Sequence, residues 1–143
     1  MREPETPKAV QMLDLLLEYF GEQGTHWTSD RYHDGHGRRC LVGALDHLRR
    51  KHRLGSADAE YFLREALPHR RGGLVYFNDR CGCFTELRSV IVKARALALR
   101  DAERVRAAAA VERWLLAEVE RERAARAMAG DDRATYSVGP RVP

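Results

Sequence analysis

The sequence predicts a mainly α-helical protein: a small helical domain with a short β hairpin or extended segment, followed by a long C-terminal helix. Two observations favour this class. Apolar residues recur at steps of three and four through much of the chain, which is the period of an amphipathic helix. In addition, no proline or glycine interrupts the segment from Thr85 to Ala129. That segment fits either one helix about 65 Å long or two helices broken near Arg100 and Asp101.

The first helix is expected over residues 7–21. Pro7 suits a first turn, where its missing N–H would have no partner in any case. Gly21 and Gly24 then close the helix. The apolar residues that recur on one face of this helix are Val10, Leu13, Leu16, Leu17 and Phe20. Such a stripe predicts that this face is turned toward a core.

The second and third helices are expected over residues 40–53 and 57–67. The apolar stripe of the second helix consists of Leu41, Ala44, Leu45 and Leu48. Gly43 lies inside the same helix, where a glycine costs about 1 kcal/mol relative to alanine. We therefore expect another group to approach the backbone closely at that point. Ser56 is expected to cap the third helix, and Pro68 to stop it.

Two segments between the helices have the residue types of β structure. Side chains alternate from Trp27 to Tyr32, and the Asp34-Gly35 pair that follows is favourable in a tight turn, so a short hairpin is expected. Further along the chain, the segment 74–77 is β-prone and bounded by turn-forming residues. That pattern predicts a short strand or extended segment.

Three parts are expected along the chain: a compact domain over residues 1–100, a helical extension over 101–129 and a flexible tail over 130–143. A core this small cannot bury the whole apolar side of so long a helix. The extension is therefore expected to pack against another protein chain, a second copy included, or to fold back on the first helix. The residues expected to make this contact are Val111, Trp114, Leu115 and Val119. Glu112 and Glu122 interrupt the heptad pattern, so no long coiled coil is predicted.

The composition excludes several classes of protein. No apolar run approaches the ~20 residues that a membrane span requires. The first residues lack the apolar region of a secretory signal. Three cysteines, an odd number, argue against a closed disulfide framework. The expected location is therefore a reducing cytoplasm. No phosphate-binding loop or dinucleotide fingerprint occurs, and no cofactor is expected.

Positive charge is concentrated in the middle of the chain. Residues 31–100 carry 15 basic and 7 acidic side chains, an excess of +8, within a chain of net charge +4. Such an excess favours contact with the phosphates of nucleic acid without recognition of bases. A solvated arginine-rich surface accounts for the same charge. The residues to which nucleic-acid contacts are assigned are Arg49, Arg50, Lys51, Arg53, Arg70 and Arg71.

Five side chains of metal-ligand type raise the hypothesis of a zinc site, because zinc takes four such ligands in a tetrahedron. They are His33, His36, Cys40, Cys81 and Cys83. However, two cysteines separated by one residue have a poorer spacing than the usual pair separated by two, and the two histidines belong to a glycine-rich turn. The interpretation favoured here is therefore ordinary residues without a metal.

Cys40 also raises the hypothesis of a thiol enzyme. A cysteine at a helix N-terminus, with basic residues beside it, tends to have a lowered thiol pKa. The candidate bases are His26, His33, His36 and His69, of which His36 is assigned to the site, and Asn78 or Asp79 could orient an imidazole. All the residue types are present, but no spacing ties them together. A buried cysteine at a helix start explains Cys40 equally well.

The order of several residues resembles a known family. A tryptophan at position 27, the run Cys-Leu-Val-Gly-Ala-Leu at 40–45 and Phe-Asn-Asp at 77–79 resemble a group of small bacterial proteins classed as a domain of unknown function, frequent in actinobacteria and their phages. The likeness covers roughly residues 8–98. It implies no activity. It implies that Cys40, Gly43 and the Asn78-Asp79 pair belong to one packed centre.

Taken together, the sequence predicts a non-enzymatic cytosolic binding or regulatory module. Its expected partner is another protein chain or a second copy, bound through the C-terminal helix, with contacts to a nucleic-acid backbone as an additional interpretation. The alternative is the thiol-dependent enzyme, which would use Cys40 with a nearby histidine and Asn78 or Asp79.

Overall fold

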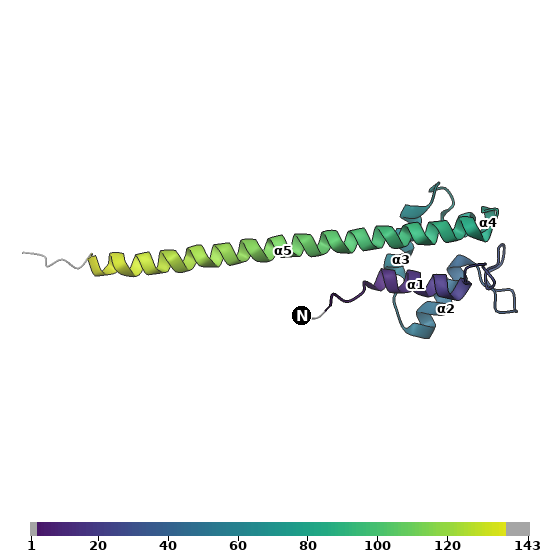
Figure 1. Ribbon diagram of the computed structural model, residues 1–143, viewed down its shortest axis with the longest axis horizontal. Helices are drawn as coiled ribbons and strands as arrows, with labels where there is room; N and C mark the ends of the chain where they lie inside the picture. The colour runs from purple at the N-terminus through teal and green to yellow at the C-terminus, as the bar shows by residue number, and fades with distance from the viewer. Residues whose placement is uncertain (1–2, 137–143) are drawn as a thin grey trace, which may run out of the picture. The chain divides into compact units, whose positions relative to one another are not determined.

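The structure is a computed structural model, which describes the backbone of residues 3–136 and the side chains of residues 3–130. Within those residues the chain is mainly helical (Figure 1). Its helices are α1 (Lys8–Phe20), α2 (Leu41–His52), α3 (Ala57–Ala66), α4 (Gly73–Arg80) and α5 (Phe84–Tyr136). The chain divides into two compact units, Met1–Ala102 and Glu103–Pro143. No helix in the described part combines the length and the apolar character needed to cross a membrane.

The core of the Met1–Ala102 unit lies between the apolar faces of its helices. Helix α1 packs against α2 and α3, and α4 packs against the same two helices. The residues most deeply buried there are Val10, Met12, Leu13, Leu16, Phe20, Leu41, Leu45, Leu63, Leu87 and Ile91. The expected stripes of the first two helices supply much of this core, because a three- and four-residue period places side chains on one helix face.

Local chemistry explains where the first three helices begin and end. The carbonyl of Pro7 accepts the first backbone hydrogen bond of α1, from Gln11 at 3.0 Å. Gly21 ends α1 with a φ of 73°, a conformation that glycine adopts without strain. The Ser56 hydroxyl at the start of α3 contacts the Glu60 carboxylate at 3.1 Å. These bounds lie within two residues of those expected from the sequence.

The expected β hairpin near Trp27 is wrong. Residues 21–40 form a loop in which Trp27 and His33 each make only an isolated bridge to Arg39. The reason lies in Asp34, whose carboxylate accepts backbone N–H bonds from His36 at 2.8 Å and Arg38 at 3.0 Å. A side chain that bonds its own backbone in this way favours a local turn over a strand ladder.

The expected strand at residues 74–77 is also wrong, because this segment belongs to α4. Gly72 precedes the helix with a φ of 78°. Leu74 and Asn78, four residues apart, are the buried positions of α4. A short apolar run has no period that separates a strand from a buried helix. The two buried residues lie four positions apart, which is the spacing of one helix face, and this segment is accordingly helical.

Helix α5 is continuous from Phe84 to Tyr136, which settles the alternative of one helix or two. Its first part contributes the buried residues Phe84, Leu87, Val90, Ile91, Ala94 and Ala98 to the core of the Met1–Ala102 unit. The expected tail over residues 130–143 overlaps the end of α5, and residues 137–143 lie outside the described part of the chain.

Candidate functional site

Asn78 is the polar centre of the Met1–Ala102 unit. It is fully buried on α4, and its Oδ1 accepts hydrogen bonds from Trp27 Nε1 at 2.8 Å and from the Leu41 backbone N–H at 2.9 Å. Its Nδ2 donates to the Thr28 carbonyl at 3.2 Å. Because a buried amide must have partners, this arrangement ties α4, the 21–40 loop and the start of α2 together. The role of Asn78 here is structural.

Cys40 is the N-cap residue of α2. Its Sγ accepts the Gly43 backbone N–H at 3.3 Å, and its side chain is only 6% exposed. Gly43 lies against the preceding loop, since a Cβ at this position would overlap the Tyr32 carbonyl oxygen. The expected close approach at Gly43 is thus present, with the backbone of Tyr32 as the approaching group.

The parts of the hypothetical thiol site are only partly brought together. Asn78 lies beside the start of α2 through its bond to Leu41, and Asp79 Oδ1 accepts the Asp30 backbone N–H at 2.8 Å. His36 is exposed in the loop. Among the described residues, no hydrogen bond joins His36 to Cys40. Both carboxamide atoms of Asn78 already have hydrogen-bond partners, and among the described residues none of these partners is His36.

The five metal-type residues do not form a cluster. Within residues 3–130, no three His, Cys, Asp or Glu side chains are grouped so as to hold a metal ion. His33 Nδ1 accepts the Gly35 backbone N–H at 3.1 Å, and Cys81 Sγ donates to the Asn78 carbonyl at 3.3 Å. Cys40 and Cys81 serve local backbone groups, and Cys83 is exposed.

The cysteines of the α4–α5 connection differ in environment. Burial, with the Glu86 carboxylate nearby, raises the pKa of the Cys81 thiol to about 11. A thiol with this pKa carries little thiolate at neutral pH, and the thiolate is the reactive form. All three cysteines are free thiols.

The six basic residues assigned to nucleic-acid contacts divide into two groups by their partners. Arg49 and Arg50 both bind the Asp46 carboxylate, and Arg70 binds Glu65 at 2.8 Å. In the described part of the chain, no ion pair engages the remaining three, which are exposed: Lys51, Arg53 and Arg71. Half of the set is therefore already paired within the molecule.

In the Glu103–Pro143 unit, the large apolar side chains of α5 are exposed. Trp114 is 59% exposed and Leu115 is 51% exposed. The other exposed members are Val105, Val111, Leu116, Val119 and Met128. The four residues expected to make a contact are thus all accessible to a partner. Exposed apolar side chains at neighbouring helical positions are typical of an interaction surface.

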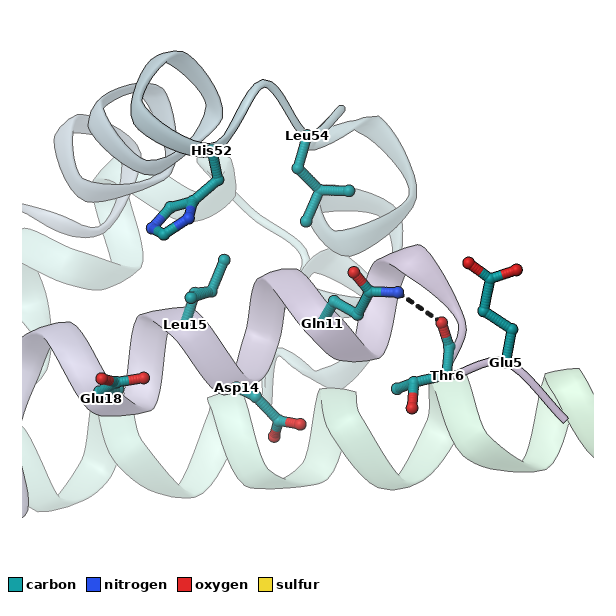
Figure 2. Close-up of a pocket in the computed structure, with 8 residues that line it drawn as sticks. All are labelled: Glu5, Thr6, Gln11, Asp14, Leu15, Glu18, His52 and Leu54. Atoms are coloured by element: carbon teal, nitrogen blue, oxygen red, sulfur yellow. Dashed lines mark hydrogen bonds between the residues drawn. The ribbon is translucent and has the colours of Figure 1, made fainter. Parts of the chain in front are cut away.

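A groove of about 620 Å³ lies between α1 and the end of α2. Figure 2 shows Leu15 directed toward His52 and Leu54, and the Gln11 amide bonded to the Thr6 carbonyl at 2.6 Å. The acidic residues that line the groove are Glu5, Asp14 and Glu18, of which Asp14 pairs with Arg95 at 2.6 Å. Gln11 and Asp14 thus have partners within the chain, and the lining of the groove does not indicate the chemistry of a ligand.

A second cavity, which we call the α2 cleft, has a volume of about 310 Å³. It is lined by Tyr32, His33, Arg39, Gly43, Asp46, His47 and Arg50. Sequence reasoning did not identify this cleft. A signal was present in the steps of three and four from Gly43 through Asp46 and His47 to Arg50, which place these residues on one face of α2. Arg39 and His33 line the cleft because of the conformation of the 21–40 loop, and no helical spacing in the sequence indicates their position.

Comparison with known proteins adds no family to these observations. No family model matches the chain, and neither a curated protein nor a solved structure matches it.

Proposed function

We propose that this protein is a non-enzymatic binding module that associates with another protein chain through residues 105–119 of α5. The observation that carries the proposal is the exposure of Val111, Trp114, Leu115 and Val119 on that helix. Removing such side chains from water stabilises a complex by about 25 cal/mol per Å² of apolar area. No other exposed group of large apolar residues of this size occurs elsewhere in residues 3–130.

The partner that we propose is a second copy of this chain, paired antiparallel. Steps of three and four on α5 join five apolar residues, Val105, Ala108, Val111, Leu115 and Val119. In a parallel pair in register, Glu118 and Glu122, which border this series, would lie near the same residues of the other copy, and like charges in contact are unfavourable. An antiparallel pair centred near residue 113 instead places Val111 against Leu115 of the partner and brings the two Trp114 side chains together.

The contact would be short and of modest affinity. The apolar series ends at Val119, because Glu122 and Arg123 occupy the next positions of the same face, so that only a few layers of side chains meet. The surface buried by so few layers falls near or below ~1,200 Å², which is the lower end for stable interfaces. We therefore expect a dimer that dissociates on dilution, with a Kd of about micromolar or weaker.

Sedimentation velocity of the full chain over a range of concentrations tests the proposal. The expected result is a dimer that increases with concentration, together with a blue shift of Trp114 fluorescence. Leu115→Ala should weaken the dimer by about tenfold or more, because each dimer loses two buried leucine side chains. Met128→Ala is the matched control, since Met128 is 73% exposed on the same helix but outside the series. A chain that remains monomeric, or equal effects of the two variants, would contradict the proposal.

Contact with a nucleic-acid backbone is the second candidate function. It is supported by the exposure of Lys51, Arg53 and Arg71, which have no carboxylate partner among the described residues. Binding of a short duplex at low ionic strength should weaken steeply with added salt, because phosphate contacts release counterions. An absence of binding at low salt would remove this function.

We also propose a cytoplasmic location. Its support is the three free thiols, because free cysteines persist in a reducing compartment. The thiol-dependent enzyme that would use Cys40 is the alternative function, and its test is the pattern of cysteine reactivity given below.

A further inference from the structure

Arg39 is a positioned cation at the α2 cleft. Its guanidinium lies over the Tyr19 ring, 5.9 Å from the ring centroid, and its Nη1 donates to the Tyr19 hydroxyl at 2.9 Å. Among the described residues, no carboxylate pairs with Arg39. A guanidinium offers five N–H donors in a planar fork, so most of its donors are left for an acceptor in the cleft. Contact with Tyr19 holds this side chain in place before any ligand arrives.

His33 supplies a second donor from an earlier part of the same loop. It forms an antiparallel bridge with Arg39, so the two residues lie side by side. Its Nδ1 accepts the Gly35 backbone N–H at 3.1 Å. A neutral imidazole carries one proton, and an accepting Nδ1 therefore leaves that proton on Nε2. The remaining ring nitrogen of His33 is a donor.

The acidic residue of the cleft is already neutralised. Asp46 accepts hydrogen bonds from the Tyr32 hydroxyl at 2.6 Å and from Arg49 at 2.5 Å, and it forms an ion pair with Arg50 at 3.1 Å. Hydrogen bonds from Tyr32 and Arg49 hold the pKa of Asp46 below its ordinary value. Since two arginines share this one carboxylate, the charge of Arg39 remains uncompensated within the cleft.

From this arrangement we propose that the α2 cleft binds the terminal phosphate group of a small phosphorylated molecule. Arg39 would bind two phosphate oxygens through its fork, and His33, His47 and Arg50 would donate to the others. A phosphate monoester has a charge near −2 at neutral pH and several strong acceptor oxygens. The cleft offers more hydrogen-bond donors than the two oxygens of a carboxylate can accept, so a phosphate group suits it better. The volume of about 310 Å³ corresponds to the lower end of small-molecule sites. The site involves only residues of the Met1–Ala102 unit and does not depend on association through α5.

His47 provides an independent readout of binding. Burial lowers the pKa of His47, as do Arg39 and His33 from the loop and Lys51 and His52 on α2. The Tyr19 ring packs against it from α1, with ring centroids 5.6 Å apart. A bound dianion would offset these positive charges and raise the pKa of His47, because an opposite charge favours the protonated form. The readout of binding is therefore a higher pKa of His47 in the presence of phosphate than in its absence.

Titration of the full chain with inorganic phosphate, followed by histidine NMR, tests the proposal. The expected result is saturable shifts of His33 and His47 and a raised pKa of His47. Arg39→Gln should weaken phosphate binding by about tenfold or more, the loss expected for one charge-assisted contact. Arg88→Gln is the matched control, because Arg88 is exposed on α5 and removes the same charge away from the cleft. Equal losses from the two variants would overturn the proposal.

Two further variants separate binding from folding. Tyr19→Phe keeps the charge of Arg39 but removes the hydroxyl that positions it, so a smaller loss of affinity is expected. His47→Gln should retain phosphate binding, followed by the saturable shift of His33. Both variants should give the thermal unfolding curve of a folded protein. A pKa of His47 that does not rise on phosphate binding in the wild type would count against the assigned role of His47.

The choice of ligand distinguishes the sources of the phosphate. Acetate should bind much more weakly than phosphate, and equal binding would overturn the assignment of a phosphate group. Ribose 5-phosphate that binds more tightly than inorganic phosphate would support a small phosphorylated molecule. A short single-stranded DNA should bind through the cleft only when it carries a 5′-phosphate. Equal histidine shifts with the unphosphorylated strand would indicate backbone contacts and would contradict the proposal.

Discussion

The indole Nε1 of Trp27 donates a 2.8 Å hydrogen bond to Oδ1 of Asn78, across 51 positions of the sequence. The same oxygen accepts the Leu41 backbone N–H at the start of α2. One side-chain amide thus joins the loop, α2 and α4. A buried amide in this position makes the geometry of the loop and of the α2 cleft depend on α4.

Replacement of Asn78 should therefore be severe. Asn78→Ala leaves the Trp27 indole N–H, the Leu41 N–H and the Thr28 carbonyl without their partner. Each buried group left unpaired costs about 1–3 kcal/mol, so a loss of about 3 kcal/mol or more in the free energy of unfolding is expected. Urea unfolding measures it. Gln11→Ala, which removes a solvent-accessible amide bond to Thr6, is the control and should cost less than about 1 kcal/mol.

Gly43 should not tolerate a side chain. A Cβ at this position would overlap the Tyr32 carbonyl, which also accepts the Cys40 N–H at 3.3 Å. Gly43→Ala should therefore destabilise the protein, although alanine is favoured over glycine within a helix by about 1 kcal/mol. At Gly55 a Cβ would meet no atom within 4 Å. Gly55→Ala should accordingly be neutral or stabilising, and thermal unfolding of the two variants compares them directly.

The three thiols should differ in their rates of alkylation. Cys83 is exposed and should react first with iodoacetamide at neutral pH. Cys81 should be slow because its pKa is raised to about 11, and Cys40 should be slow because it is buried. Peptide mapping by mass spectrometry after short exposures gives the order. Rapid modification of Cys40 ahead of Cys83 would instead favour the thiol-dependent enzyme.

Acidification should destabilise the protein through His47. The pKa of His47 is lowered in the folded state, by burial first and then by Arg39. The unfolded chain therefore takes up a proton at a higher pH than the folded chain does. The contribution of neutral His47 to the free energy of unfolding should be fully present above the ordinary histidine pKa of about 6.5. It should decrease as the pH falls below that value. The free energy of unfolding measured from pH 7.5 to 5 should fall less steeply in His47→Gln than in the wild type; an identical slope would contradict the assignment.

The helical character and the long C-terminal helix could be predicted from the sequence, and the structure confirms both. The bounds of α1, α2 and α3 followed from a clear period together with end signals such as Gly21 and Pro68. The β hairpin and the strand at residues 74–77 could not be decided correctly. A four-residue apolar run has no diagnostic period, and the turn at Asp34 depends on side-chain bonds to its own backbone.

The candidate sites were predictable to different degrees. The exposure of the apolar residues of α5 agrees with the expectation that a small core cannot cover them. The α2 cleft was not predictable, because Arg39 enters it through a loop conformation set by Asn78 and by the approach of Tyr32 to Gly43. Contacts between residues distant in sequence create this site, and no local pattern encodes them.

The close approach of the Tyr32 carbonyl to Gly43 has a consequence for how the α2 cleft could change. Its lining includes Gly43, where two stretches of main chain meet, and the side chains of His33, Arg39, His47 and Arg50. A substitution of one of these four side chains leaves the contact between the Tyr32 carbonyl and Gly43 in place. Under the proposed phosphate binding, such substitutions would change the preferred ligand while the main chain of the cleft stays the same.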